Sequence, residues 1–146
     1  MEGKERITRA LNRKEVDRTP VWFMRQAGRH LPEYRKLARE HDFWERCKDT
    51  DICSRISLQP IERYPGIDAT IVFSDILTPL PSLGYEVKYG GGIKIDPFEF
   101  EDVDSWPEFR AREHAPWAGD ALAEIGLQEE NKARLGFAGC PWTISM

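Results

Sequence analysis

Two arginines and one aspartate stand where short loops follow apolar runs, and these residue types can bind and orient a small acidic molecule. Arg25 and Arg29 belong to the loop 25–29, and Asp75 follows Ser74 at the end of another apolar run. A guanidinium presents a planar fork of N–H groups, which suits two-pronged binding of a carboxylate. Alternatively, a single carboxylate among arginines is only their salt-bridge partner.

Strand-length apolar runs precede these loops, and helical patterns separate the runs. We expect strands at 21–24, 67–73 and 134–139, and helices at 4–12, from Pro32 to about Glu40, from Thr50 with Pro60 as a kink or stop, and at 116–130. This alternation predicts a parallel α/β sheet with right-handed crossovers. The loops 25–29, 74–77 and 138–143 should then converge at the edge where the strands end.

A further segment, 85–95, alternates with period two around Gly90, Gly91 and Gly92. Two alternating runs around a glycine turn predict a β-hairpin. Its polar alternation places the hairpin outside the core. The glycines lack the lysine and helix start of a phosphate-binding loop, so we interpret them as a turn.

The charge distribution favours a small acidic ligand over a nucleic acid. The net charge is −4, yet residues 1–50 carry 13 basic and 9 acidic side chains, and the stretch 18–39 holds six basic residues against Glu33. A long phosphate backbone requires a basic field over a whole face, whereas a concentrated arginine patch suits a small polyanion. The alternative is a solvated basic helix face.

Composition and cysteine usage limit the other function classes. With 146 residues, 40% of them hydrophobic, the chain has material for one core, and no apolar run is long enough to span a bilayer. The three cysteines, Cys47, Cys53 and Cys140, are an odd number and suggest no disulfide framework, which favours the cytoplasm. Neither C-x-x-C nor H-E-x-x-H spacing occurs, so we expect no metal site.

Three segments resemble the uroporphyrinogen decarboxylase family. The longest is Arg18-Thr-Pro-Val-Trp-Phe-Met-Arg-Gln-Ala-Gly-Arg-His-Leu-Pro-Glu-Tyr-Arg35, which is similar to the N-terminal signature of the family. The segment 73–77 resembles the family's aspartate loop, and 136–143 its second signature. His30 stands where a tyrosine is usual, and Cys140 where alanine is common. The order and separation of the segments also match.

The resemblance implies a fold, a reaction and a set of site residues. The family fold is a (β/α)8 TIM barrel, usually dimeric, and the enzyme removes the carboxyl groups of the four acetate side chains of uroporphyrinogen to give coproporphyrinogen, without cofactor or metal. By this resemblance Asp75, Arg25 and Arg29 are catalytic. Substrate binding falls to Arg25, Gln26, Ala27, Gly28, Arg29 and Asp75.

The length of the chain shapes these expectations. A complete barrel needs about 250 residues, so we expect residues 1–146 to be the N-terminal part of one barrel domain, truncated at the C-terminus, with about three barrel strands plus the hairpin. One alternative is a catalytically incompetent fragment that only binds a tetrapyrrole. Another is a corrinoid-linked methyltransferase on the same fold, which the Arg-Gln-Ala-Gly-Arg loop disfavours.

Overall fold

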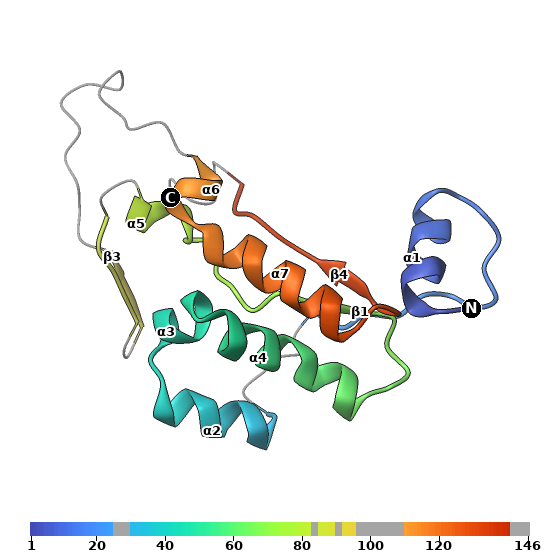
Figure 1. The fold of residues 1–146 in the computed structure, drawn as a ribbon, viewed down its shortest axis with the longest axis horizontal. Helices are drawn as coiled ribbons and strands as arrows, with labels where there is room; N and C mark the ends of the chain where they lie inside the picture. Colours follow the sequence, from blue (N-terminus) through green and yellow to red (C-terminus); the bar gives the residue numbers. More distant parts are fainter. Residues whose placement is uncertain (25–29, 83–84, 90–91, 96–109, 141–146) are drawn as a thin grey trace.

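The computed structural model describes residues 1–24, 30–82, 85–89, 92–95 and 110–140 as helices packed on a small parallel sheet (Figure 1). The helices are α1 (Gly3–Leu11), α2 (Pro32–Glu40), α3 (Phe43–Lys48), α4 (Thr50–Arg63), α5 (Pro79–Ser82), α6 (Ala111–His114) and α7 (Pro116–Gln128). The strands are β1 (Ala69–Ile71), β2 (Val87–Tyr89), β3 (Ile93–Ile95) and β4 (Ala133–Leu135). No helix in these described ranges is both long and apolar enough to cross a membrane.

The parallel pairing expected from the sequence is present. β1 and β4 pair in parallel, with Ala69 opposite Ala133 and Ile71 opposite Leu135. The connection between them carries α5, the hairpin, α6 and α7. Helices α4 and α7 pack against each other and against this sheet. The α/β fold class is therefore confirmed.

The first expected strand, 21–24, is not a regular strand. The backbone of Val21 makes one ladder-like contact, since its carbonyl accepts a hydrogen bond from the Asp68 N–H at 2.8 Å. The Val21 N–H instead donates to the Asp68 carboxylate at 2.7 Å. With its N–H bound to a side chain, the segment lacks the repeated backbone pairing that defines a strand.

Several element boundaries differ from expectation for local reasons. Asp49, not Thr50, caps α4, because the Asp49 side chain accepts a hydrogen bond from the Ile52 N–H. The helix continues through Pro60 to Arg63, so Pro60 is not a stop. Helix α3 was not expected, although Asp42 and Glu45 form a reciprocal capping box at its start.

The hairpin pairs β2 and β3 as expected, with Val87 opposite Ile95. Its predicted place outside the core is only half right. Val87 is buried against Leu77 and Leu80, and Tyr89 packs at the edge of this cluster. One face of β2 is therefore part of the protein interior, and the hairpin is held against α3 by a hydrogen bond from Trp44 Nε1 to the Val87 carbonyl.

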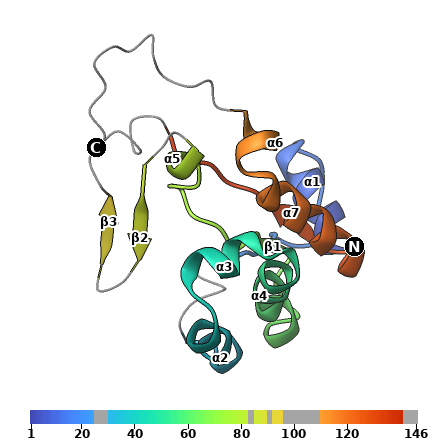
Figure 2. The same ribbon diagram turned by 60° about the vertical axis from the view of Figure 1, so that its left-hand side comes forward.

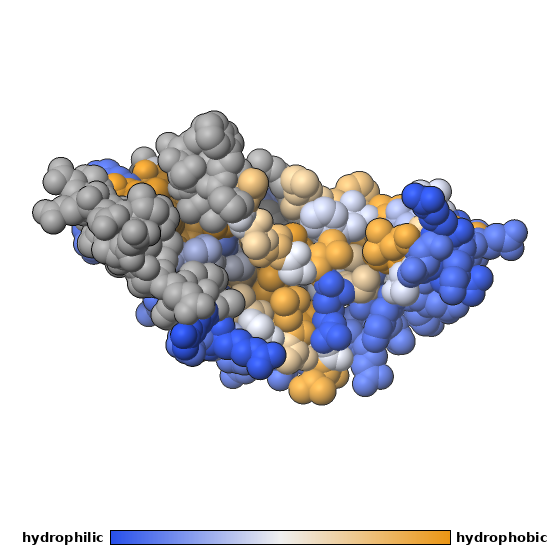
Figure 3. Space-filling view, turned by 90° about the horizontal axis from the view of Figure 1, so that it is seen from above, coloured by the Kyte–Doolittle hydropathy of each residue, from blue (hydrophilic) through white to orange (hydrophobic). Residues whose placement is uncertain are grey.

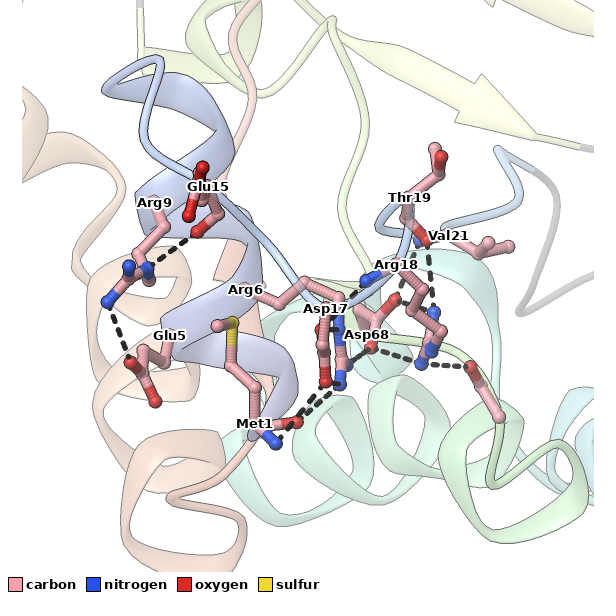
Figure 4. A network of polar contacts seen from close by, with 11 residues as sticks. Met1, Glu5, Arg6, Arg9, Glu15, Asp17, Arg18, Thr19, Val21 and Asp68 are labelled. Carbon is pink, nitrogen blue, oxygen red and sulfur yellow. Dashed lines mark hydrogen bonds and ion pairs between the residues drawn. The ribbon is translucent and has the colours of Figure 1, made fainter.

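A buried carboxylate joins the N-terminal segment to the sheet (Figure 4). Asp68 is fully buried, and its two oxygens accept hydrogen bonds from both terminal nitrogens of Arg18, at 2.7 and 2.8 Å, and from Arg6 at 2.5 Å. The Nε and Nη2 atoms of Arg6 also donate hydrogen bonds to the Asp17 carboxylate, at 2.6 and 2.7 Å. A β-carbon on Gly3 would lie 2.6 Å from the Asp68 carbonyl oxygen, so glycine allows α1 to approach this site.

The pKa of Asp68 reflects the balance in this network. Burial alone disfavours the charged form, but hydrogen bonds from Arg18, the Val21 N–H and Arg6 outweigh it and lower the pKa below its usual value. The carboxylate therefore contributes stability only while it is ionised.

The surface is divided between polar and apolar regions. Figure 3 shows apolar side chains across the middle of one face and hydrophilic side chains gathered at the end that holds α1. Phe23 and Met24 are exposed to 64% and 78%, and Phe137, just beyond β4, to 40%. Apolar residues that follow the extended segments thus lack cover from the described part of the chain.

Replacing the buried carboxylate should destabilise the fold and change its acid dependence. Asp68→Asn leaves Arg6 buried without its inner partner, and we expect a loss of about 3 kcal/mol or more in the free energy of unfolding. Because the pKa of Asp68 is lower in the folded chain, this contribution is complete above about pH 5 and falls as the pH drops through 4.

Urea denaturation between pH 3 and 7 measures both effects. The wild type should lose stability toward acid more steeply than Asp68→Asn. Asp120→Asn, which changes an exposed carboxylate on α7, should behave as wild type. Equal acid slopes for wild type and Asp68→Asn would contradict the assigned role.

Candidate active site

Asp75 lies in a tight turn just after β1, where the sequence places it. Its Oδ1 accepts a hydrogen bond from the Leu77 N–H at 2.7 Å, and its carbonyl accepts one from the Thr78 hydroxyl at 2.6 Å. Ser74 and Thr78 are joined through their hydroxyl oxygens at 3.1 Å. These contacts fix the backbone of the turn and hold the half-buried Asp75 side chain in one orientation.

The Asp75 side chain lines a cleft of about 840 Å³ between α2, α3 and the hairpin. These elements lie together on the side of the molecule away from α1 (Figures 1 and 2). Charged and aromatic side chains dominate the lining: Tyr34, Arg35, Arg39, His41, Asp42, Phe43, Arg46, Asp75 and Tyr89, with Ala38, Gly92 and Ile93. A cleft of this size and composition can hold a multiply charged organic molecule.

Three arginines give this cleft its basic character. Arg35 and Arg39 are exposed on α2, whereas Arg46, on α3, is buried with 8% of its surface accessible. Arg46 donates to the Tyr34 hydroxyl at 2.6 Å and to the Asp42 carbonyl at 3.0 Å. Arg35 and Arg39 belong to the basic patch seen in the sequence, but Arg46 was missed. The capping box at Asp42 was the available signal for the helix that carries it.

The predicted arginine loop cannot be placed beside this cleft. Arg25, Gln26, Ala27, Gly28 and Arg29 lie outside the described residues. The structure places the residues on either side: Val21 is bound to Asp68, and Leu31 is buried in a cluster with Tyr34 and Ile56. The chain is therefore anchored at Val21 and again at Leu31, and the roles of the loop residues between them stay predictions.

Tyr89 forms the wall of the cleft near Asp75. Its ring packs against that of Phe43 in a tilted arrangement, with centroids 4.0 Å apart. The hydroxyl is buried and has no hydrogen-bond partner among the described residues. Burial, together with the nearby Asp75 carboxylate, raises the pKa of Tyr89 well above its usual range. The phenol is therefore neutral, and its buried oxygen lies close to the Asp75 carboxylate.

Neither a metal cluster nor a reactive buried thiol is found in the described ranges. No three His, Cys, Asp or Glu side chains gather in those ranges as metal ligands would. Burial raises the pKa of Cys47, and raises that of Cys53 to about 11. Both thiols stay protonated near neutral pH, so neither is an activated nucleophile. Cys140, in contrast, is exposed.

Comparison with known families and proteins gives a consistent result. The family described as Uroporphyrinogen decarboxylase (URO-D) matches residues 2–146. A uroporphyrinogen decarboxylase of Alcanivorax borkumensis is 43% identical over 97% of this chain and 41% of its own length. That of Magnetococcus marinus is 41% identical over 99% of this chain and 42% of its own length. The chain thus spans about two-fifths of the length of these curated relatives.

Solved structures agree on the fold. A methyltransferase from Methanosarcina mazei matches 99% of this chain and 44% of its own chain with a TM-score of 0.78 and 16% identity. At that identity the likeness shows the fold alone. It supports the (β/α)8 class expected from the sequence, present here as a part of the barrel.

The two tyrosine hydroxyls of the cleft should affect stability in opposite directions. Tyr89→Phe removes a buried hydroxyl that lacks a partner, so we expect a gain of up to about 1 kcal/mol in the free energy of unfolding. Tyr34→Phe removes the acceptor of a buried arginine, so we expect a loss of about 1–3 kcal/mol. Urea denaturation at pH 7 measures both values, and a loss in Tyr89→Phe would show that its hydroxyl is bonded after all.

Proposed function

Because the chain belongs to the uroporphyrinogen decarboxylase family, we propose that it carries the Asp75 part of the active site of a uroporphyrinogen decarboxylase. The reaction removes the carboxyl groups of four acetate side chains of uroporphyrinogen III and yields coproporphyrinogen III, in haem and tetrapyrrole biosynthesis. It is a carboxy-lyase reaction, and the proposal includes no cofactor. Its partner is the small-molecule substrate, with no role for nucleic acid or membrane.

One observation carries this proposal: Asp75 shares a cleft with three arginines. A porphyrinogen bears carboxylates around its rim and pyrrole N–H groups at its centre. Arginines match the rim, and a fixed carboxylate matches the N–H groups. The same arrangement explains why an acidic protein concentrates basic residues within 18–39.

Asp75 stabilises the charge that develops during the reaction. Protonation of an electron-rich pyrrole carbon makes the ring cationic, and the ring then accepts the electron pair released as carbon dioxide leaves the acetate. A carboxylate near the pyrrole N–H groups favours that cation. The hydrogen bond from the Leu77 N–H to Oδ1 fixes the orientation of this carboxylate, and one preorganised group of this kind contributes about 3–4 kcal/mol.

The arginine loop completes the proposed site. Arg25 and Arg29 pair with substrate carboxylates, and Gln26, Ala27 and Gly28 line the same loop, with Gly28 allowing close approach of the backbone. Arg25 delivers the proton to the pyrrole carbon, either directly or through a water. The route through a water is included because arginine gives up a proton with difficulty.

The domain assignment is also a proposal. We place residues 1–146 as the N-terminal part of a single barrel domain that forms a homodimer in the cytoplasm. The exposed Phe23, Met24 and Phe137 support this placement, because further barrel strands would cover apolar residues beside β1 and β4. The chain's coverage of about two-fifths of its curated relatives agrees with a partial barrel.

Two alternatives make different predictions. The structural similarity to the Methanosarcina mazei methyltransferase does not support methyl transfer by this chain, because a match at 16% identity shows only a shared fold. A chain that binds tetrapyrrole without decarboxylating it remains a distinct outcome. Turnover of uroporphyrinogen separates it from the enzyme: binding without release of coproporphyrinogen would favour the binding-only reading.

Neutralising Asp75 should lower turnover sharply and preserve the fold. Asp75→Asn keeps an oxygen for the Leu77 N–H but loses the charge, and we expect a fall in kcat of about two to three orders of magnitude. Coproporphyrinogen formation is followed by chromatography after oxidation. Asp51→Asn, at an exposed site on α4, is the control. Normal turnover in folded Asp75→Asn would remove Asp75 from the mechanism.

Changing the geometry of Arg29 while keeping its charge should weaken substrate binding. Arg29→Lys retains a cation but loses the fork that pairs with a carboxylate in two places, so we expect KM to rise about tenfold with a smaller change in kcat. Steady-state kinetics with uroporphyrinogen III measure both. An unchanged KM would exclude Arg29 from carboxylate binding.

A further inference from the structure

Arg46 is a buried cation held by aromatic rings. Its guanidinium lies 5.3 Å from the ring centroid of Tyr34, 5.7 Å from that of Phe43 and 5.6 Å from that of Phe73. Hydrogen bonds to the Tyr34 hydroxyl and the Asp42 carbonyl fix its orientation. The side chain is therefore preorganised, and binding of a ligand costs little additional conformational entropy.

No carboxylate neutralises this buried charge within the described part of the chain. Both hydrogen-bond partners of Arg46 are neutral oxygens, and it forms no ion pair there. Arg6 gives a comparison in the same molecule: it is similarly buried, at 6% exposure, and it pairs with both Asp17 and Asp68. Burial of an unpaired charge is costly, and Arg46 relies on aromatic rings and neutral oxygens where Arg6 has carboxylates, so its charge is available to an anionic ligand.

Arg46 also has unused hydrogen-bonding capacity. A guanidinium has five N–H groups, and Arg46 uses one on Nε and one on Nη1. Donors on both terminal nitrogens remain, and they form the fork that a carboxylate accepts in two places. Arg46 lines the same cleft as Asp75, so one multiply charged ligand in this cleft can contact both residues.

The other charged groups of the cleft favour an anion as well. The acidic members are Asp42 and Asp75, and each has one oxygen occupied by a backbone N–H, of Glu45 and Leu77 respectively. The basic members are Arg46 and the exposed Arg35 and Arg39, with His41 as a further polar group. Arginines therefore outnumber carboxylates around the opening.

We propose that Arg46 forms a carboxylate-binding subsite in this cleft, which holds one acidic side chain of the substrate while Asp75 faces the pyrrole N–H groups. The inference rests on the proposed function, since it takes the cleft as the tetrapyrrole site. It adds a binding residue from α3 to those expected in the loop 25–29. Arg35 and Arg39, at the rim, attract the polyanion but are too exposed to orient it.

The test uses a single pyrrole that carries one acetate and one propionate, porphobilinogen, as a probe for the full 146-residue chain. Isothermal titration gives its Kd. Loss of a charge-assisted pair weakens binding by about tenfold or more, so we expect that increase in Kd for Arg46→Gln and a smaller increase for Arg46→Lys. The control Arg55→Gln changes an exposed arginine on α4 outside the cleft and should leave Kd within twofold.

A purely structural role for Arg46 gives a different pattern. In that case Arg46→Gln lowers the melting temperature but leaves Kd unchanged, and the proposal is wrong. If Arg46→Gln does not fold, nuclear magnetic resonance of the wild type decides: the Nε–H signal missing from Arg46→Lys should shift on saturation with the probe. A signal that does not move, or a wild-type chain that shows no saturable binding, also overturns the proposal.

Failure of this inference is distinguishable from failure of the proposed function. Porphobilinogen binding involves no decarboxylation, and Asp75→Asn should leave the Arg46-dependent part of the affinity in place. If the chain turns over uroporphyrinogen and Arg46→Gln has the wild-type KM, the function stands and the subsite is wrong. If Arg46 controls probe binding but the chain releases no coproporphyrinogen, the subsite stands and the function is wrong.

Discussion

The buried carboxylate of Asp68 is the interaction on which the arrangement of the N-terminal half depends. It accepts hydrogen bonds from Arg6 on α1, from both terminal nitrogens of Arg18 and from the Val21 N–H. The backbone N–H of Asp68 in turn donates to the Val21 carbonyl. One residue just before β1 thereby ties a helix and an extended segment to the sheet. A hydrophobic contact could not do this, because only the directed bonds set the register of 18–21 against β1.

That register has consequences for the site. β1 runs into the turn that bears Asp75, and the hydrogen bonds of Asp68 place the segment 18–21 beside the start of that strand. The cleft then combines two kinds of positive charge. Arg35 and Arg39 are solvated and adaptable, whereas Arg46 is fixed among aromatic rings. Attraction of a polyanion and its orientation are thus divided between different residues.

Features governed by local chemistry were predictable from the sequence, and those governed by tertiary placement were not. Pro32 begins α2 as expected, because proline suits the first helical turn, and the glycine turn specifies the hairpin. Asp75 was found because it follows a β-branched run. Arg46 and Tyr89 were missed, since only packing of α3 against the hairpin brings them to the cleft. The segment 21–24 does not form a regular strand, because the Val21 N–H donates to the side chain of Asp68 and not to the backbone of a neighbouring strand.

A structure of the chain with bound uroporphyrin would test the central claim most directly, that the cleft between α2, α3 and the hairpin receives a tetrapyrrole. Our account predicts the macrocycle in that cleft, with its inner N–H groups toward Asp75 and one peripheral carboxylate on Arg46. A porphyrin bound elsewhere on the molecule, or in this cleft with a carboxylate group against Asp75, would contradict it.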